Sequence, residues 1–77
     1  MANMAKKVEI SVVIPAYNEQ ENVGILYRKL KPVLDRLRKK YEIIYVDDGS
    51  TDKTFDVLVQ IHKKDKSVKV IKFRKNF

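Results

Sequence analysis

Two short polar segments follow apolar runs and carry the side chains best suited to binding a ligand. Residues 15–19 read Pro-Ala-Tyr-Asn-Glu, and residues 47–52 read Asp-Asp-Gly-Ser-Thr-Asp. An aromatic ring can cover the face of a planar base, and a carboxylate can accept hydrogen bonds from a base N–H or a ribose hydroxyl. Each segment ends a predicted strand and opens a predicted helix. Both turns therefore fall at the carboxyl edge of one parallel sheet, where open α/β sheets bind ligands.

The residues alone leave the roles of these side chains open. Tyr17 either covers a ligand or packs on the second helix. Asn18 and Glu19 are most simply a helix cap and a first-turn residue, with ligand contact as a second role. Asp47 and Asp48 look like a metal-binding pair, but adjacent residues of a strand point to opposite faces. One carboxylate is thus expected to face the ligand crevice, while the other caps the turn or the second helix.

Composition excludes several other kinds of site. Glycine occurs only at Gly24 and Gly49, so neither a Gly-rich dinucleotide fingerprint nor a P-loop can be written. There is no cysteine, and the lone His62 falls on a predicted helix away from the turns. No apolar run approaches the roughly 18 residues of a membrane span, and the first seven residues lack the apolar core of a signal peptide. We expect a cytoplasmic protein with no nucleophilic triad.

The net charge of +7 is unevenly placed along the chain. Basic residues concentrate over 28–40 and 63–75, whereas half of the acidic residues lie in or beside the two polar turns. The lysines are either solvated helix faces or a surface that attracts anionic lipid headgroups or phosphates. Nucleic acid is not an expected partner, because no recognition-helix, zinc-finger or paired-aromatic signature accompanies the charge.

The elements that must position the turns follow from apolar periodicity. Residues 8–14 form a first strand that we expect Pro15 to end, because proline has no N–H for a ladder. Asn18, with Glu21 three residues on, predicts a capping box for a helix reaching about residue 40, kinked near Leu30 by Pro32. Its sheet-facing apolar stripe comprises Val23, Leu26, Leu30, Val33, Leu34 and Leu37.

The remaining elements complete a β-α-β-α-β chain. Residues 42–46 form the second strand, Ser50 or Thr51 caps a helix to about Lys64, and residues 68–73 form the third strand. Right-handed crossovers then give an α/β fold with a three-stranded parallel sheet of strand order 3-2-1. This is one half of a Rossmann-like doubly wound domain.

That arrangement leaves the first strand at an edge. Its apolar sequence carries no protecting charge between Val12 and Ile14, and an unpaired edge of this kind templates association. We therefore expect the chain to form homodimers or larger homo-oligomers through Ser11–Ile14.

At the two polar turns the chain resembles the family 2 glycosyltransferases, enzymes of the GT-A fold that use nucleotide sugars. The resemblance rests on the segments 13–19 and 42–52 and extends from about residue 9 to the end of the chain. The ending 70–77 looks more like the polyprenyl-phosphate branch, which includes dolichyl-phosphate mannose synthases. Residues 1–8 are then an N-terminal extension, and 9–77 are the N-terminal, nucleotide-binding part of a longer glycosyltransferase domain.

The resemblance implies a set of site residues. The Pro-x-Tyr-x-Glu turn and the second aspartate of the Val-Asp-Asp element would hold the base and ribose of UDP or GDP. Asn18 and Asp47 look more structural in such enzymes. The implied nucleotide-binding residues are Pro15, Ala16, Tyr17, Glu19, Val46 and Asp48.

The chain also departs from the family pattern. Family members bind Mg²⁺ or Mn²⁺ through a later Asp-x-Asp element and use a still later carboxylate as the base, and this chain contains neither segment. We therefore expect the parent enzyme to transfer a sugar from UDP- or GDP-sugar to a polyprenyl phosphate at a membrane surface, with the metal bound elsewhere. The 77-residue chain alone is expected to be inactive. The alternative is a self-associating βαβαβ module without nucleotide function.

Overall fold

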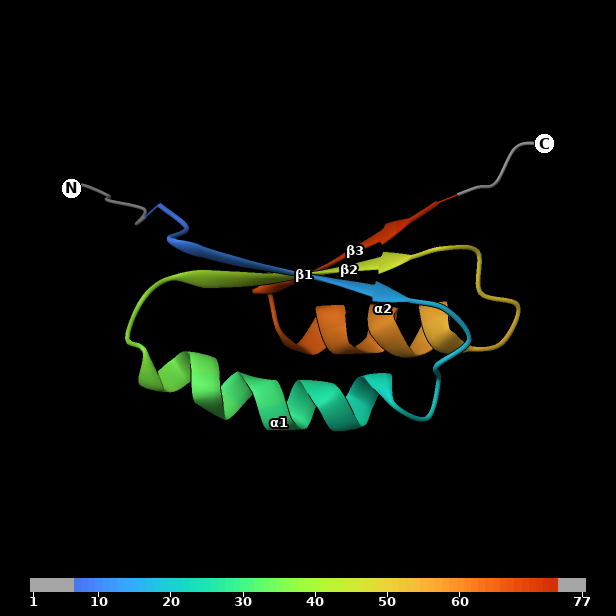
Figure 1. The fold of residues 1–77 in the computed structure, drawn as a ribbon, viewed down its shortest axis with the longest axis horizontal. Coiled ribbons are helices and arrows are strands. Elements are labelled where there is room, and N and C mark those ends of the chain that lie inside the picture. The colour runs from blue at the N-terminus through green and yellow to red at the C-terminus, as the bar shows by residue number, and fades with distance from the viewer. Residues whose placement is uncertain (1–6, 74–77) are drawn as a thin grey trace.

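The computed structural model describes residues 7–73 and contains a three-stranded parallel sheet with both helices on one of its faces (Figure 1). The predicted α/β class and the order of elements are confirmed, while the ends of the elements differ by a few residues from those expected. Part of the predicted N-terminal extension and residues 74–77 lie outside the described residues. The elements are β1 (Ile10–Ala16), α1 (Val23–Arg36), β2 (Tyr41–Asp47), α2 (Thr54–Lys64) and β3 (Val68–Lys72).

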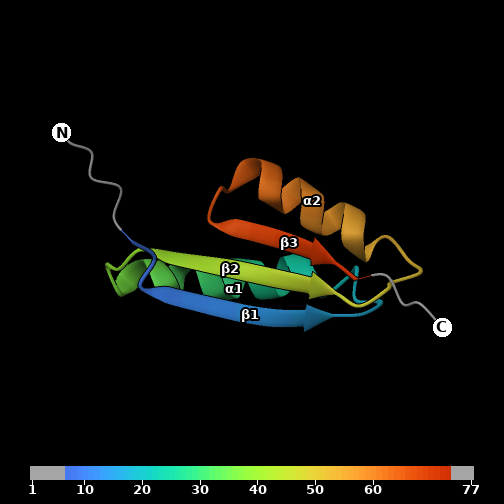
Figure 2. The same cartoon turned by 90° about the horizontal axis from the view of Figure 1, so that it is seen from above.

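The strands lie in the order β1-β2-β3, which is the predicted order 3-2-1 counted from the other edge (Figure 2). All pairs are parallel, with Ile10 opposite Tyr41 and Ile43 opposite Val68. Because both crossovers run in the same direction across the sheet and share one hand, both helices must lie on the same face. The turns that follow β1 and β2 therefore meet at one edge of the sheet, as Figure 2 shows.

The core lies between the sheet and the two helices. Alternate residues of β2 point toward the helices, so Ile43, Tyr45 and Asp47 are fully buried. Apolar residues of all five elements join them. The buried apolar cluster comprises Ala16, Val23, Leu34, Ile43, Tyr45, Leu58 and Val68.

The opposite face of the sheet is uncovered within the described residues. Val13 of β1 is 60% exposed, Ile71 of β3 is 46% exposed and Phe73 is 53% exposed. In the described part of the chain, only the helix-facing side of β1 is covered. The sheet therefore presents apolar side chains to solvent, with Ser11, Glu42 and Lys69 hydrogen-bonded across its amino-terminal end.

The predicted start and stripe of the first helix were wrong in part. Helix α1 begins at Val23 after the N-cap residue Asn22, so Asn18 and Glu21 do not form a capping box. The helix is continuous through Pro32 and ends at Arg36. Tyr27 packs against the core in place of Leu26. The other stripe residues that remain substantially exposed are Val33 at 51% and Leu37 at 49%.

Two further boundary predictions were wrong. Strand β1 continues through Pro15, which lies opposite Val46, because β1 is an edge strand. The carbonyl of Ala16 accepts the Asp48 N–H, so the backbone of Pro15 points away from β2 and its missing N–H costs no ladder bond. Helix α2 begins after Lys53 rather than at Ser50 or Thr51.

Candidate functional site

The two turns at the carboxyl edge are joined through the side chain of Asn18. Its Oδ1 accepts the backbone N–H of Thr51 at 2.8 Å and that of Asp52 at 3.3 Å. In return, the backbone N–H of Asn18 donates to Ser50 Oγ at 2.9 Å. Asn18 adopts a φ of +49°, a left-handed conformation that asparagine tolerates better than most residues. The residue predicted to cap a helix therefore fastens one turn to the other.

A second set of contacts joins the same turns closer to the helices. The Glu19 N–H donates to Thr54 Oγ1 at 2.8 Å, and the Thr54 hydroxyl donates onward to Asp52 Oδ1. The Lys53 N–H donates to Gln20 Oε1 at 3.0 Å. Thr54 is fully buried, so this relay fixes the Glu19 backbone against the start of α2. The backbone amides of Glu19 and Lys53, which precede the two helices, are thus bonded across the turns.

The neighbouring aspartates of the second turn have different surroundings. Asp47 is fully buried on the helix side of the sheet, and its Oδ1 accepts the Ser50 N–H at 2.9 Å. Asp48 is exposed, and its backbone N–H donates to the Ala16 carbonyl at 3.0 Å. Gly49 follows with a φ of +80°, which turns the chain sharply between them and the second helix. Of these two aspartates, therefore, only Asp48 presents its carboxylate at the surface of this edge.

The residues expected to hold a nucleotide gather at this edge without forming one enclosed cavity. Tyr17 is 52% exposed and is not buried against the second helix. Pro15 and Val46 are register partners on the uncovered face of the sheet. Pro15, Ala16 and Glu19 line a cavity of about 120 Å³ that reaches Tyr45. The structure brings all six residues to one edge, on both sides of the sheet.

The edge is acidic. A second depression of about 240 Å³ is lined by Glu19, Glu21 and Asp52 together with the amide side chains of the first turn. The hydrogen bond from the Thr54 hydroxyl lowers the pKa of Asp52, so this carboxylate remains ionised. Within residues 7–73 no three His, Cys, Asp or Glu side chains are placed to hold a metal ion together. The described part of the site offers hydrogen-bond acceptors but no metal cradle.

Sequence reasoning missed the residues that close the two turns against each other. Ser50 and Thr51 were predicted as alternative caps of the second helix, and neither Gln20 nor Thr54 had a predicted role. A pair of Ser/Thr/Asn-rich turns at the same sheet edge is a usable signal, because their side chains can satisfy each other's backbone amides.

His62 has a structural contact, and the two described helices are too short to span a membrane. The Nδ1 atom of His62 lies 2.6 Å from the Val68 carbonyl oxygen, which makes this nitrogen the donor and ties α2 to β3. Neither helix of the described segment is long and apolar enough to cross a membrane.

Comparison with known proteins gives a consistent family. A sequence model described as glycosyl transferase family 2 matches residues 11–77. The chain is 41% identical over 70 residues to an uncharacterized glycosyltransferase of Synechocystis sp., covering 91% of this chain and 22% of that protein. It is 36% identical over 74 residues to an uncharacterized glycosyltransferase of Bacillus subtilis, covering 96% of this chain and 23% of that protein.

A third relative carries a more specific name. The chain is 44% identical over 52 residues to an undecaprenyl-phosphate 4-deoxy-4-formamido-L-arabinose transferase of Photorhabdus laumondii, covering 68% of this chain and 16% of that protein. The chain thus spans about a fifth of the length of the curated relatives it matches.

Proposed function

The chain belongs to glycosyl transferase family 2, and we propose that its carboxyl sheet edge holds the base and ribose of a UDP- or GDP-sugar. The observation that carries this proposal is the closure of the two turns by Asn18 and Thr51, which fixes Tyr17 and Asp48 at neighbouring positions of one edge. Tyr17 offers a half-exposed aromatic face for a base, and Asp48 offers an exposed carboxylate for a ribose hydroxyl or base N–H.

The other predicted residues support this arrangement from the strands. Pro15 and Val46 lie side by side on the uncovered sheet face, and Glu19 is fixed by Thr54. Asn18 and Asp47 act on the backbone of the turns rather than on the ligand, since Asn18 Oδ1 and Asp47 Oδ1 accept backbone amides there and Asp47 is fully buried. The roles of these seven residues therefore divide between ligand contact and support.

The experiment is an NMR-monitored titration of the 77-residue chain with UDP and GDP, with and without Mg²⁺. We expect saturable shifts at the amides of Tyr17 and Asp48, strongly reduced in Asp48→Ala and retained in Asp56→Ala. Asp56 is an exposed aspartate in the first turn of α2, outside the predicted site residues, so it controls for the change in charge. A folded spectrum without shifts, or shifts reduced equally by both variants, would contradict the proposal.

For the parent enzyme, we propose transfer of the sugar to a polyprenyl phosphate. The relative in Photorhabdus is named for transfer to undecaprenyl phosphate, and this chain is 44% identical to part of it. A lipid acceptor would bring the parent enzyme to the cytoplasmic surface of a membrane. Mg²⁺ or Mn²⁺ would neutralise the leaving diphosphate there. No Asp-x-Asp element occurs in these 77 residues, so we expect this chain to show no sugar transfer when assayed alone with Mn²⁺.

A second candidate function is self-association, favoured by the edge position of β1. Its outward backbone is unpaired by any other described strand, and Val13 beside it is 60% exposed. Light scattering at increasing concentration tests this candidate. We expect a homodimer or larger homo-oligomer that Val13→Lys disrupts, whereas a monomer at high micromolar concentration would contradict it.

A further inference from the structure

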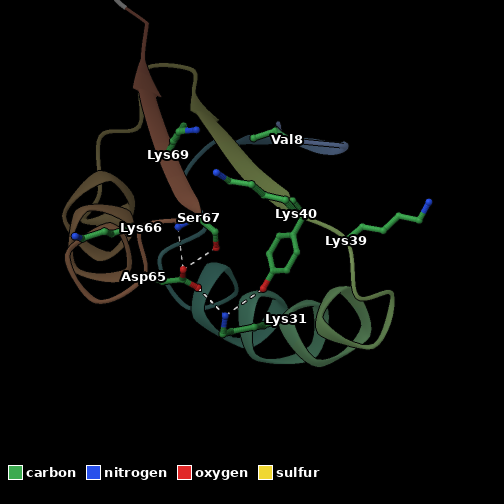
Figure 3. A pocket seen from close by; sticks show the side chains of 9 residues that line it. Val8, Lys31, Lys39, Lys40, Asp65, Lys66, Ser67 and Lys69 are labelled. Carbon is green, nitrogen blue, oxygen red and sulfur yellow. Dashed lines mark hydrogen bonds and ion pairs between the residues drawn. The ribbon is translucent and has the colours of Figure 1, made fainter. Parts of the chain in front are cut away.

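A cavity of about 480 Å³ lies at the amino ends of β2 and β3, at the opposite end of the sheet from the two polar turns (Figure 3). It opens between the loop that joins α1 to β2 and the loop that joins α2 to β3. Five lysines and one carboxylate line it. The lining comprises Val8, Lys31, Lys39, Lys40, Tyr41, Asp65, Lys66, Ser67 and Lys69.

The single lining carboxylate is already saturated with donors. Asp65 accepts the Tyr27 hydroxyl at 2.6 Å, and the backbone N–H and hydroxyl of Ser67 at 3.0 and 2.6 Å. Lys31 Nζ lies 3.1 Å from Asp65 Oδ2, the oxygen that also accepts the Tyr27 hydroxyl, whereas Ser67 donates to Oδ1. Although burial opposes ionisation, these hydrogen bonds hold the pKa of Asp65 well below its usual range. The floor of the cavity is therefore an ion pair with no net charge, and the negative charge of Asp65 is already neutralised without the other lysines.

The lysines around the mouth differ in what they already contact. Lys69 pairs with Glu42 at 2.6 Å, and Lys39 lies 3.8 Å from Glu9. Lys40 and Lys66 form no ion pair with any of the described residues. Two uncompensated ammonium groups thus flank the cavity from its two loops.

The positions of these side chains suit an anion that arrives from solvent. In Figure 3, Lys40 extends across the mouth toward β3, whereas the side chain of Lys66 lies over α2 with its ammonium group directed away from the mouth, so it must turn to reach a ligand there. Lysine is a flexible point charge and can turn toward a phosphate without a fixed fork geometry. The hydroxyl of Ser67 already donates to Asp65, so the ammonium groups are the donors available here.

We propose that this cavity binds a phosphate group through Lys40 and Lys66. Its volume falls within the roughly 300–1,000 Å³ of pockets that hold small ligands, so a phosphorylated compound or a lipid headgroup fits the same chemistry. The site lies at the other end of the strands from the Tyr17 and Asp48 edge and does not depend on the nucleotide proposal. Recognition by point charges predicts binding that weakens as salt is added.

The test follows ¹⁵N-labelled chain during titration with inorganic phosphate at low ionic strength. We expect saturable shifts at the amides of Lys40, Lys66 and Ser67, with little change at the two polar turns. Lys40→Gln/Lys66→Gln should weaken binding by about tenfold or more, because a hydrogen bond to a charged group is worth on the order of tenfold in affinity. The matched control is Lys29→Gln/Lys63→Gln, which removes the same charge from exposed positions outside the cavity.

A second experiment distinguishes a lipid headgroup from a soluble phosphate compound as the natural ligand. Vesicles of phosphatidylglycerol and of phosphatidylcholine are mixed with the chain and sedimented. Retention on phosphatidylglycerol that depends on Lys40 and Lys66 assigns the site to a lipid headgroup, and retention on neither assigns it to a soluble phosphate compound. Equal weakening by both double variants, or the absence of saturable shifts at the cavity, would overturn the proposal, since the charge would then act diffusely.

Discussion

The side-chain oxygen of Asn18, on the turn after β1, accepts the backbone N–H of Thr51, on the turn after β2, at 2.8 Å. These residues are 33 positions apart, and the bond between them brings the two ends of the candidate nucleotide site into one unit. The arrangement is reciprocal, because the Asn18 N–H donates to Ser50. The two turns at this edge are therefore hydrogen-bonded to each other before any ligand binds.

Replacement of Asn18 tests that joint. Asn18→Ala should lower the free energy of unfolding by about 1–2 kcal/mol, because it removes bonds to two backbone amides and places alanine at a φ of +49°. Asn18→Gly keeps the conformation and should cost roughly half as much. Urea denaturation followed by circular dichroism measures both.

The control for Asn18 is its neighbour Asn22. Asn22 is the N-cap residue of α1, but its side chain makes no capping hydrogen bond. Asn22→Ala should therefore change stability by less than about 0.5 kcal/mol. A larger loss at Asn22 than at Asn18 would show that capping of α1 by Asn22, and not the joint between the turns, dominates.

The two glycines should respond to alanine in opposite directions. Gly49 has a φ of +80° with open space around an added Cβ, so Gly49→Ala should cost about 1–2 kcal/mol through backbone strain alone. Gly24 lies in α1, where an added Cβ meets only the end of the Arg28 side chain at 3.4 Å. Gly24→Ala should raise stability by up to about 1 kcal/mol. Thermal melts of both variants check the signs, and stabilisation by Gly49→Ala would contradict the turn geometry.

The buried hydroxyl of Tyr45 should be dispensable. Its oxygen has no hydrogen-bond partner among the described residues, and burial raises the pKa of this phenol. Tyr45→Phe removes an unsatisfied polar group and should leave stability unchanged or raise it by about 1 kcal/mol. Chemical denaturation gives the answer. A clear loss of stability would mean that the hydroxyl has a partner in the native protein.

Stability should fall in acid through Asp65. Its pKa is depressed in the folded chain, so the unfolded state binds a proton first as the pH falls below about 4, the ordinary range of aspartate. The contribution is fully present above that pH and is lost progressively as the pH falls toward the folded pKa. Asp65→Asn should lower stability at pH 7 and flatten the pH dependence below about 4.

The same measurement on Asp56→Asn supplies the reference. Asp56 is exposed on α2 and takes no part in the Tyr27, Asp65 and Lys31 network. Its replacement should leave the acid limb of the stability curve intact. An acid limb that is equally steep in Asp65→Asn and in the unmodified chain would show that other carboxylates control it.

The sequence by itself determined the class and order of the elements. β-Branched runs alternate with apolar residues at helical spacing, so local pattern was enough to predict βαβαβ, a parallel sheet and the edge at which Tyr17 and Asp48 lie. The family resemblance, carried by residues 13–19 and 42–52, was likewise confirmed by the match over residues 11–77. These features depend on local sequence patterns, which can be recognised in a single amino-acid sequence.

The tertiary structure alone decided the partners of individual side chains. Asn18 caps no helix, because its side-chain oxygen accepts the amides of Thr51 and Asp52 on the other turn. Tyr27 rather than Leu26 belongs to the core-facing side of α1, and its hydroxyl donates to Asp65, the C-cap residue of α2. Contacts between residues more than 30 positions apart depend on how the crossovers and turns are arranged in three dimensions. Local periodicity does not encode that arrangement, so these contacts could not be predicted from it.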